Sequence, residues 1–596
     1  MTEKSEAPSG CSFLFQEVGS ETLLIPEDFN DEQQMFAKTA RDFMEREVHP
    51  RIDEMEHGDH ELMRELLLKS AEVGFLGIDI PVDYGGLQVD KTTSMLVAEN
   101  LASYASFATT YSAHTTIGTL PLLYFGTEEQ KQKWLPKLAT GELLAAYALT
   151  EPSSGSDALS AKTRAMLSED GEHYIVDGQK MWITNAGFSD LFTVFCQIDG
   201  NKFTAILIES DRDGVSTGAE EKKMGLKGSS TRLLNLEQVK VPKENVLGEI
   251  GKGHKIAFNI LNIGRFKLGV GTLGAAKRAA KIATMYAKER VAFGQPIANF
   301  GAIKAKLGQM LVDLYALESS CYRVAGYMDE GLEQLDRSRE DYAQETMKQI
   351  EEFAVEDSIL KVLGSEVASQ IIDEALQIHG GMGYSAELEI ERLYRDVRIN
   401  RIFEGTNEIN RMLIPGMILK RMGKGQFNLF TLIQAVDEVL EADEPELPQF
   451  DQMDHLVEER QIVERAKQLT LYSANQAIQK HMADLRDQQE ILMLLADQLI
   501  DVYAMDSTVA RTLQLARAGR TKDLDLKTDA TRVLVAACFG RVRQRSETLV
   551  CHIANARTLD THLDALAKLA VIPRQDTIRL RRKLGEALIE RERYFF

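Results

Sequence analysis

The thirteen residues RIFEGTNEINRML (Arg401–Leu413) carry the most information in this chain. A carboxylate, Glu404, stands between an apolar approach and a glycine, just before a predicted helix start. Thr406 or Asn407 can cap that helix, and Gly405 leaves room for a ligand beside the carboxylate. Apolar neighbours disfavour the charged form of an acid, so the pKa of Glu404 should rise toward that of a useful base. The plainer alternative is a surface glutamate at a helix N-terminus, which is a common arrangement.

Composition describes an ordinary globular protein. The 596 residues are 44% hydrophobic and 27% charged, and the net charge of −22 argues against nucleic acid or anionic membranes as partners. Five widely spaced cysteines without a CxxC pair predict neither a metal site nor a disulfide framework. The N-terminus lacks the pattern of a signal or transit peptide, and no apolar run is long enough for a transmembrane segment. A bacterial-type cytoplasm is the simplest expected location, and a processed organellar protein is the alternative.

The pattern of the sequence changes along the chain. HYIVDGQKMWIT (His173–Thr184) predicts a strand, a tight turn and a second strand, and further strands are predicted at 191–198, 202–209 and 232–241. Helical periodicity returns at Gly253, and an acidic, proline-bearing linker separates the last segment. We expect an α+β, mainly α protein with these parts: a loose N-terminal tail (1–26), a helical domain (27–144), a β-domain (145–250), a helical bundle (251–424), a linker (425–449) and a further helical domain (450–596).

One glycine motif matches a nucleotide-binding pattern, and we predict that this match is accidental. GVGTLG (Gly269–Gly274) matches the glycine pattern of dinucleotide-binding loops, with Glu289 at a fitting distance. That pattern needs a strand before it, whereas the flanking residues 256–268 and 275–286 are helix-like. We therefore expect these glycines to lie inside a helix, where small residues permit close packing with a neighbouring helix.

Three other segments could contact a flat cofactor. YALTEPSSGSD (Tyr147–Asp157) offers hydroxyls and amides for a polar ring edge and a phosphate. Trp182 and Thr184 are two residues apart, so one strand face presents an aromatic plane beside a hydroxyl. QIHGGMGY (Gln377–Tyr384) ends an amphipathic helix with glycines that allow a ligand close to the backbone. Each segment alone is better explained as a turn, a core tryptophan or a helix C-cap.

Together these segments resemble, in order and spacing, the acyl-CoA dehydrogenase family. The resemblance runs from about residue 28 to 424 through TEPSSGSD, KMWITN, MGLKGSSTRLLNLEQVKVP, ERVAFGQPI, QIHGGMGY and RIFEGTNEI. The extra helical segment is most similar to the very-long-chain branch. The resemblance implies an N-terminal helical domain, a middle β-domain and a C-terminal four-helix bundle, here followed by an additional helical domain, with FAD as cofactor.

The resemblance also assigns residues. Glu404 matches the base that removes the α-proton of an acyl thioester while a hydride passes from Cβ to flavin N5. Some branches carry the base on an earlier helix, and the matching position here, Gly264, has no carboxylate. Ala113 matches the blind end of the acyl pocket, where a medium-chain relative has a glutamate, so a long acyl chain is expected. The implied FAD contacts are Tyr147, Leu149, Thr150, Gly155, Ser156, Trp182, Ile183, Thr184, Arg290, Phe293, Gln377, Ile378, His379, Gly380, Gly381, Thr406 and Asn407. The implied substrate contacts are Ala113, Ser156, Arg265 and Gly405.

The family also implies partners. A homodimer is the smallest expected unit, because Arg290, Phe293 and residues 377–381 would reach the FAD of the neighbouring subunit. Long-chain acyl-CoA is the expected substrate, and electron-transfer flavoprotein is the expected acceptor in fatty-acid β-oxidation. Two alternatives stay open, namely an acyl-CoA oxidase and a scaffold or assembly protein with residual dehydrogenase activity. The additional helical domain, about 450–596, is expected to cover a surface on which tailless relatives pair two dimers.

Overall fold

The structure of this protein is a computed structural model that describes residues 9–339, 341–443 and 445–596. The N-terminal helices are α1 (Ser12–Phe15), α2 (Asp31–Phe43), α3 (Ile52–Glu56), α4 (His60–Glu72), α5 (Lys91–Leu101), α6 (Ala105–Ser112), α7 (Leu120–Phe125) and α8 (Glu128–Thr140). The sheet consists of β1 (Ala145–Ala148), β2 (Arg164–Leu167), β3 (His173–Thr184), β4 (Leu191–Ile198), β5 (Lys202–Glu209), β6 (Val215–Thr217), β7 (Thr231–Pro242) and β8 (Val246–Leu247). These are followed by α9 (Gly253–Glu289), the hairpin β9 (Val291–Ala292) and β10 (Gln295–Pro296), α10 (Gly301–Glu333), α11 (Tyr342–Glu352), α12 (Ala354–His379), α13 (Glu389–Val397) and α14 (Asn407–Gly423). The last helices are α15 (Leu429–Glu441), α16 (Val457–His481), α17 (Gln489–Arg517), α18 (Leu524–Ile553), α19 (Leu559–Leu569) and α20 (Thr577–Arg591).

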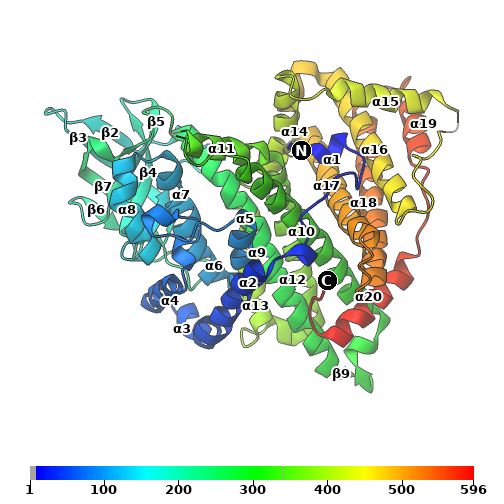
Figure 1. Cartoon of the computed structure of the whole chain (residues 1–596), viewed down its shortest axis with the longest axis horizontal. Helices are drawn as coiled ribbons and strands as arrows, with labels where there is room; N and C mark the ends of the chain where they lie inside the picture. The colour runs from blue at the N-terminus through cyan, green and yellow to red at the C-terminus, as the bar shows by residue number, and fades with distance from the viewer. Residues whose placement is uncertain (1–8, 340, 444) are drawn as a thin grey trace.

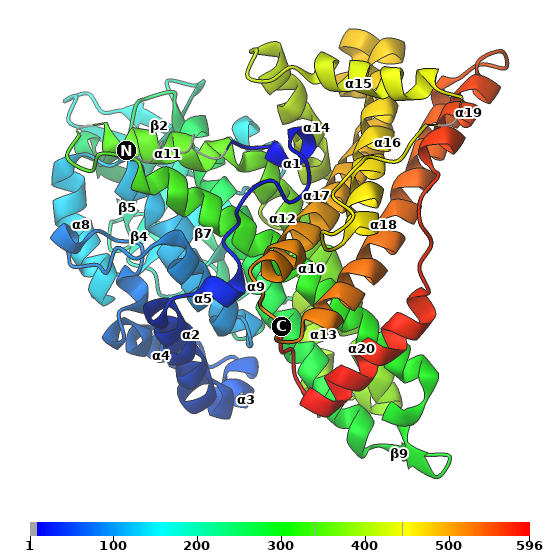
Figure 2. The ribbon, with the colours of Figure 1, turned by 45° about the vertical axis from the view of Figure 1, so that its right-hand side comes forward.

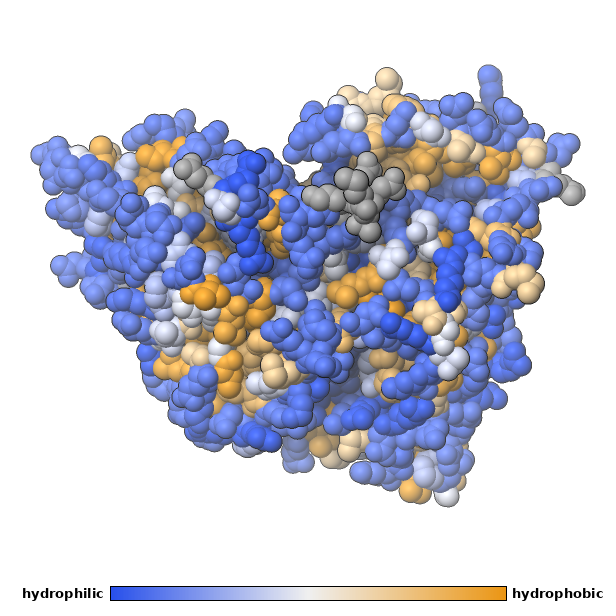
Figure 3. Space-filling view, in the orientation of Figure 1, coloured by the Kyte–Doolittle hydropathy of each residue, from blue (hydrophilic) through white to orange (hydrophobic). Residues whose placement is uncertain are grey.

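The sheet lies at one end of the molecule, the long helices α9, α10 and α12 lie in the middle, and α16 to α19 lie at the other end (Figures 1 and 2). The predicted α+β, mainly α class is confirmed. Polar side chains cover most of the face in Figure 3, with smaller apolar groups between them. In the part of the chain that the structure describes, no helix combines the length and the apolar character needed to cross a membrane.

The sheet has the order β6-β7-β3-β2-β4-β5-β8, and β1 pairs with β4 in parallel. Strands β4 and β5 have the predicted bounds. The predicted turn within His173–Thr184 is wrong, because β3 is one continuous strand that pairs with β7 through two irregularities of register. Gly178 marks the first of them. A Cβ there would lie 2.4 Å from the Thr163 hydroxyl, so the glycine allows close approach of a neighbouring segment instead of a turn.

The long helix α9 contains the GVGTLG glycines, as predicted, so they form no nucleotide-binding loop. A Cβ on Gly269 would lie 3.0 Å from the backbone oxygen of Leu360 in α12, and one on Gly274 would lie 2.0 Å from that of Glu99 in α5. These glycines therefore let α9 cross two neighbouring helices at short distance, which holds the bundle around the site.

The additional helical domain packs on the bundle through α17 against α10 and α14, and through α20 against α10. Within it, α16, α17 and α18 pack on one another. Its first helix, α15, occupies most of the segment 425–449 that we expected to be a linker. Ile433 and Val436 of α15 are buried and α15 packs on α16, so the linker prediction is wrong for residues 429–441.

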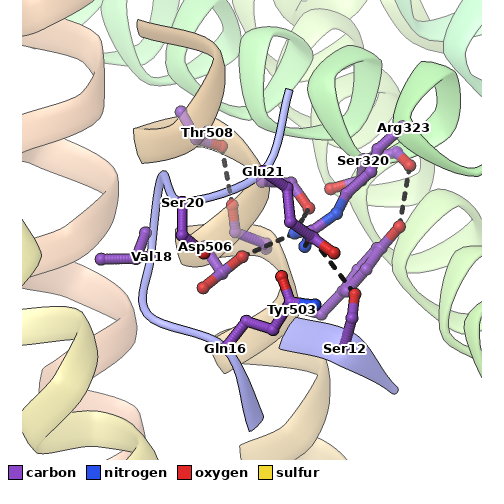
Figure 4. A network of polar contacts seen from close by, with 12 residues as sticks. Ser12, Gln16, Val18, Ser20, Glu21, Ser320, Arg323, Tyr503, Asp506 and Thr508 are labelled. Carbon is purple, nitrogen blue, oxygen red and sulfur yellow. Dashed lines mark hydrogen bonds and ion pairs between the residues drawn. The ribbon is translucent and has the colours of Figure 1, made fainter. Parts of the chain in front are cut away.

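Residues 9–28 form a segment that we call the N-terminal strap. The loose tail predicted for residues 1–26 is wrong for residues 9–26, while residues 1–8 lie outside the described part. Phe13 meets Tyr503 of α17 edge to face, with ring centroids 5.0 Å apart. Glu21 accepts from Arg323 of α10 at 3.0 Å, and Arg323 also pairs with Asp506 of α17 at 2.6 Å (Figure 4). The strap thus lies between the bundle and the additional helical domain and contacts both.

Candidate active site

The loop from Ile402 to Thr406 joins a short 3-10 turn to α14. Glu404 and Gly405 have φ angles of 58° and 79°, and two successive left-handed residues turn the chain sharply. The Asn410 side-chain amide donates to the Gly405 carbonyl at 2.9 Å, which closes the turn. The Thr406 hydroxyl accepts the N–H of Ile409 at 3.3 Å. Of the two predicted cap residues, Thr406 and Asn407, Thr406 is therefore the one that caps α14. A non-glycine residue held at positive φ marks Glu404 as a functional candidate.

The carboxylate of Glu404 is buried near two positively charged side chains. Its Oε2 is buried and has no hydrogen-bond partner among the described residues. Burial raises the pKa of Glu404 to about 7, against the opposing effects of the Arg265 and Lys361 charges. Buried Arg265 donates through Nε to the Glu404 carbonyl oxygen at 3.3 Å. A carboxylate with a pKa near the working pH suits proton transfer, because it is partly ionised and still basic.

Gly264 of α9 lies directly against this carboxylate. A Cβ on Gly264 would lie 2.7 Å from Oε2 and 3.0 Å from Cδ of Glu404. The position on α9 and the position on the loop therefore converge on the same volume. The missing side chain at Gly264 is what leaves room for the Glu404 carboxylate.

Tyr147 of β1 belongs to the same region. Its hydroxyl is buried without a partner among the described residues, and burial followed by the Glu404 charge raises the pKa of Tyr147 far above its usual range. Its ring packs edge to face on Phe195, with centroids 5.0 Å apart. Buried Ala113 begins a π-helical segment, Ala113–Gly118, that contacts both β1 and α9. The segment with the predicted pocket-floor residue and the loop with the base thus both lie against α9.

The β-domain candidates lie in the loop after β1 and at the end of β3. Thr150 accepts the N–H of Met181 at 2.8 Å, which ties the loop after β1 to β3. Trp182 has a φ of 57° at the second register irregularity, and 58% of its surface is exposed. The other candidates here are Leu149 and Thr184, which are half-buried, Gly155 and Ser156, which are exposed, and Ile183. Ile183 differs from the rest, because its side chain is buried in the core of the sheet and leaves only its backbone for a ligand.

A second group of candidates lies at the far end of α9. Phe293, 95% exposed, projects from the β9–β10 hairpin just after Arg290, and Gly380 and Gly381 end α12 with open space at their Cβ positions. His379 stacks on Tyr286 with ring centroids 4.2 Å apart, which joins the ends of the two helices. Of the other members of this group, Gln377 is exposed and Ile378 is buried.

The two groups are far apart within one chain. Gly264, beside the base, and Glu289, before the hairpin, are separated by most of α9, which at about 1.5 Å per residue is roughly 37 Å. One small ligand cannot touch both groups of a single chain.

The side-chain amide of Asn407, another predicted FAD contact, is hydrogen-bonded within the chain. Its Oδ1 accepts from Lys361 at 2.7 Å, and its Nδ2 donates to Ser365 and Glu366, each at 2.9 Å. The sequence analysis missed Lys361. Its only signal was a lysine within the otherwise apolar run ILKVLG of α12.

Four family models match the chain. They are described as the acyl-CoA dehydrogenase N-terminal domain (30–142), middle domain (146–239) and C-terminal domain (251–419), with a second C-terminal domain model at 465–568. A "Probable acyl-CoA dehydrogenase" of Bacillus subtilis is 45% identical over 99% of both chains. The human "Very long-chain specific acyl-CoA dehydrogenase, mitochondrial" is 35% identical over 85% of this chain and 79% of its own.

Solved structures agree with these matches. An acyl-CoA dehydrogenase complexed with FAD from Bacillus anthracis has a TM-score of 0.96 and 45% identity, over 99% of this chain and 100% of that one. Butyryl-CoA dehydrogenase from Megasphaera elsdenii has a TM-score of 0.60 and 38% identity, over 66% of this chain and 99% of that one. The second structure is thus matched over nearly its whole length by about two thirds of this chain. With matching family models over most of its length and these relatives, the chain belongs to the acyl-CoA dehydrogenase family.

Proposed function

We propose that this protein is an FAD-dependent dehydrogenase that oxidises long-chain acyl-CoA to trans-2-enoyl-CoA, with Glu404 as the base. The observation that carries the proposal is the buried carboxylate of Glu404, whose pKa is raised to about 7 and which occupies the space left by Gly264. An acid of this kind can remove a proton next to a thioester carbonyl.

The residues present fit FAD. Trp182 presents an exposed aromatic plane on the sheet, and the adjacent loop offers the hydroxyls of Thr150 and Ser156. Gly155 has open space at its Cβ position, as do Gly380 and Gly381, so a ligand can approach the backbone closely. When bound, FAD supplies the acceptor for the hydride that leaves Cβ of the substrate.

The protein side of the reaction needs a base and a donor to the thioester oxygen. In the proposed step, Glu404 Oε2 takes the α-proton, and negative charge develops on the thioester oxygen. Among the described residues the backbone N–H of Glu404 has no hydrogen-bond acceptor, so it is free to donate to that oxygen. Buried Arg265 holds the Glu404 carbonyl and keeps this turn in place.

The proposal also covers the acyl-chain length of the substrate and the electron acceptor. Ala113 puts a methyl group where a carboxylate would shorten the pocket, and each CH₂ buried there contributes roughly 0.8 kcal/mol. The human relative, named for its specificity for very long chains, favours the same preference. Electron-transfer flavoprotein is the proposed acceptor and fatty-acid β-oxidation the proposed process. The cytoplasmic location stays a prediction.

A homodimer is part of the proposal. The distance of roughly 37 Å along α9 separates Phe293 and Arg290 from Glu404, so these residues would serve the cofactor of a second copy. The 95% exposure of Phe293 leaves its ring accessible to a second copy of the chain.

The test is an anaerobic titration of the FAD-loaded protein with palmitoyl-CoA. We expect the flavin of the wild type to bleach and that of Glu404→Gln to stay oxidised while FAD remains bound. The matched control is Glu408→Gln, which changes an exposed glutamate in the first turn of α14 and should bleach normally. Normal bleaching of Glu404→Gln would remove the assignment of the base. A wild type that binds FAD but does not bleach would favour the scaffold role, and reoxidation by oxygen faster than by electron-transfer flavoprotein would favour an oxidase.

A further inference from the structure

Lys361 lies in the middle of α12 with none of its surface exposed. Its neighbours Leu360 and Val362 are buried apolar residues. A buried ammonium group is unfavourable unless polar or charged groups compensate it. Among the described residues its hydrogen bond is to Asn407 Oδ1 at 2.7 Å, and no carboxylate lies within ion-pair distance. Packing alone therefore does not explain why a lysine occupies this buried position.

The partners of Lys361 hold the loop that carries Glu404. Asn407, directly after the loop, accepts from Lys361 and donates to Ser365 and Glu366 of α12. Glu366 also pairs with Arg401, directly before the loop, at 2.6 Å. Both ends of residues 402–406 are therefore fastened to one helix, on either side of the base.

The charges around Lys361 come from four parts of the chain. Glu404 faces it from the loop, Arg265 from α9, Glu408 from α14 and Glu366 from its own helix. Burial lowers the pKa of Lys361 to about 7, while burial raises that of Glu404 to about 7. The two groups therefore titrate over the same range and must be treated as a coupled pair. A positive charge on Lys361 favours the ionised, basic form of Glu404.

We infer that Lys361 is a positioning residue for the reaction, which fastens the catalytic loop through Asn407 and holds a positive charge beside the Glu404 carboxylate. The inference rests on the proposed role of Glu404 as the base. In the proposed step α12 contacts neither reacting atom of the substrate. Through Lys361 it would nevertheless set the pH range in which Glu404 acts as a base.

The first test is the pH dependence of flavin bleaching by palmitoyl-CoA in FAD-loaded Lys361→Met. We expect the limiting rate at pH 7 to fall at least tenfold and the acidic limb of the profile to move up by at least one pH unit. The rate should approach that of the wild type near pH 9.5, where Lys361 is uncharged in the wild type as well. Half-saturation by palmitoyl-CoA should change less than threefold, and Lys361→Arg should restore the acidic limb.

Lys267→Met is the matched control. Lys267 is equally buried on α9, but it pairs with Asp79 at 2.8 Å. This variant should lower the thermal midpoint without moving the acidic limb. A loss of rate in Lys361→Met that is the same at every pH, or an acidic limb that does not move, would overturn the inference.

A second measurement does not need turnover. Thermal midpoints of the wild type, Lys361→Met, Glu404→Gln and the double variant give the coupling between the two residues at each pH. We expect a coupling at pH 7 that disappears at pH 10. No coupling at pH 7, or the same coupling at both pH values, contradicts the inference. If palmitoyl-CoA fails to bleach the wild type, the proposed function fails, and this cycle still decides the role of Lys361.

Discussion

Replacing Arg323 by methionine should release the N-terminal strap. Arg323 is 2% exposed and donates to Glu21 at 3.0 Å, to Asp506 at 2.6 Å and to the Tyr327 hydroxyl at 2.9 Å. Removing one member of a buried ionic group costs roughly 3 to 5 kcal/mol, because its partners stay buried without compensation. Here Asp506 keeps Lys467 at 2.9 Å, so we expect about 3 kcal/mol, the lower end of that range.

Urea unfolding of the FAD-loaded protein measures this loss, and limited proteolysis shows where the chain opens. We expect a lower unfolding midpoint and new cleavage within residues 9–28. Arg339→Met is the matched control, since Arg339 pairs with Asp341 in an exposed setting, and it should leave the midpoint unchanged. A loss below about 1 kcal/mol for Arg323→Met, or cleavage elsewhere first, would refute the claim that this network fastens the strap.

Three other changes give distinct outcomes. Ala113→Glu should lower the ratio of turnover efficiency on palmitoyl-CoA to that on octanoyl-CoA, because a carboxylate at the pocket floor blocks volume and must lose its water; an unchanged ratio removes Ala113 from the floor. Gly264→Ala should slow flavin bleaching while FAD stays bound, since the new Cβ would lie 2.7 Å from Glu404 Oε2; a wild-type rate would show that the carboxylate lies elsewhere during the reaction. Light scattering should find the intact chain as a dimer, whereas a chain ending near Gly425 should form larger assemblies or aggregate; a tetrameric intact protein or a well-behaved truncated dimer contradicts the proposed cover.

The sequence predicted those features that depend on local chemistry. The glycines Gly269 and Gly274 were placed inside a helix because their flanks have helical periodicity, and the structure has them in α9. The bounds of β4 and β5 followed from apolar runs between turn residues. The cluster around Glu404 was visible because the carboxylate, the glycine and the cap are adjacent in the chain.

The features that the sequence did not predict depend on distant contacts. Asp177 and Gly178 are residue types typical of a turn, which led to the wrong prediction. Position 178 requires glycine because Thr163 of a neighbouring segment lies close to it. Glu21 and Arg323 are 302 residues apart, and neither shows a periodic pattern before the fold brings them together. The lysine in the run ILKVLG was too weak a signal for Lys361, because its partner Asn407 lies 46 residues further along the chain.

The strap has a consequence for the order in which the molecule is completed. Its Glu27 accepts from Arg511 and Lys527, which follow it by 484 and 500 residues. At ordinary elongation rates those partners leave the ribosome roughly 25 to 100 s after the strap does. Closing so long a loop is slow and entropically unfavourable, so the strap is among the last segments to dock. During that interval the strap is accessible to proteases. A tag fused ahead of the strap would lie beside one of the last contacts to form.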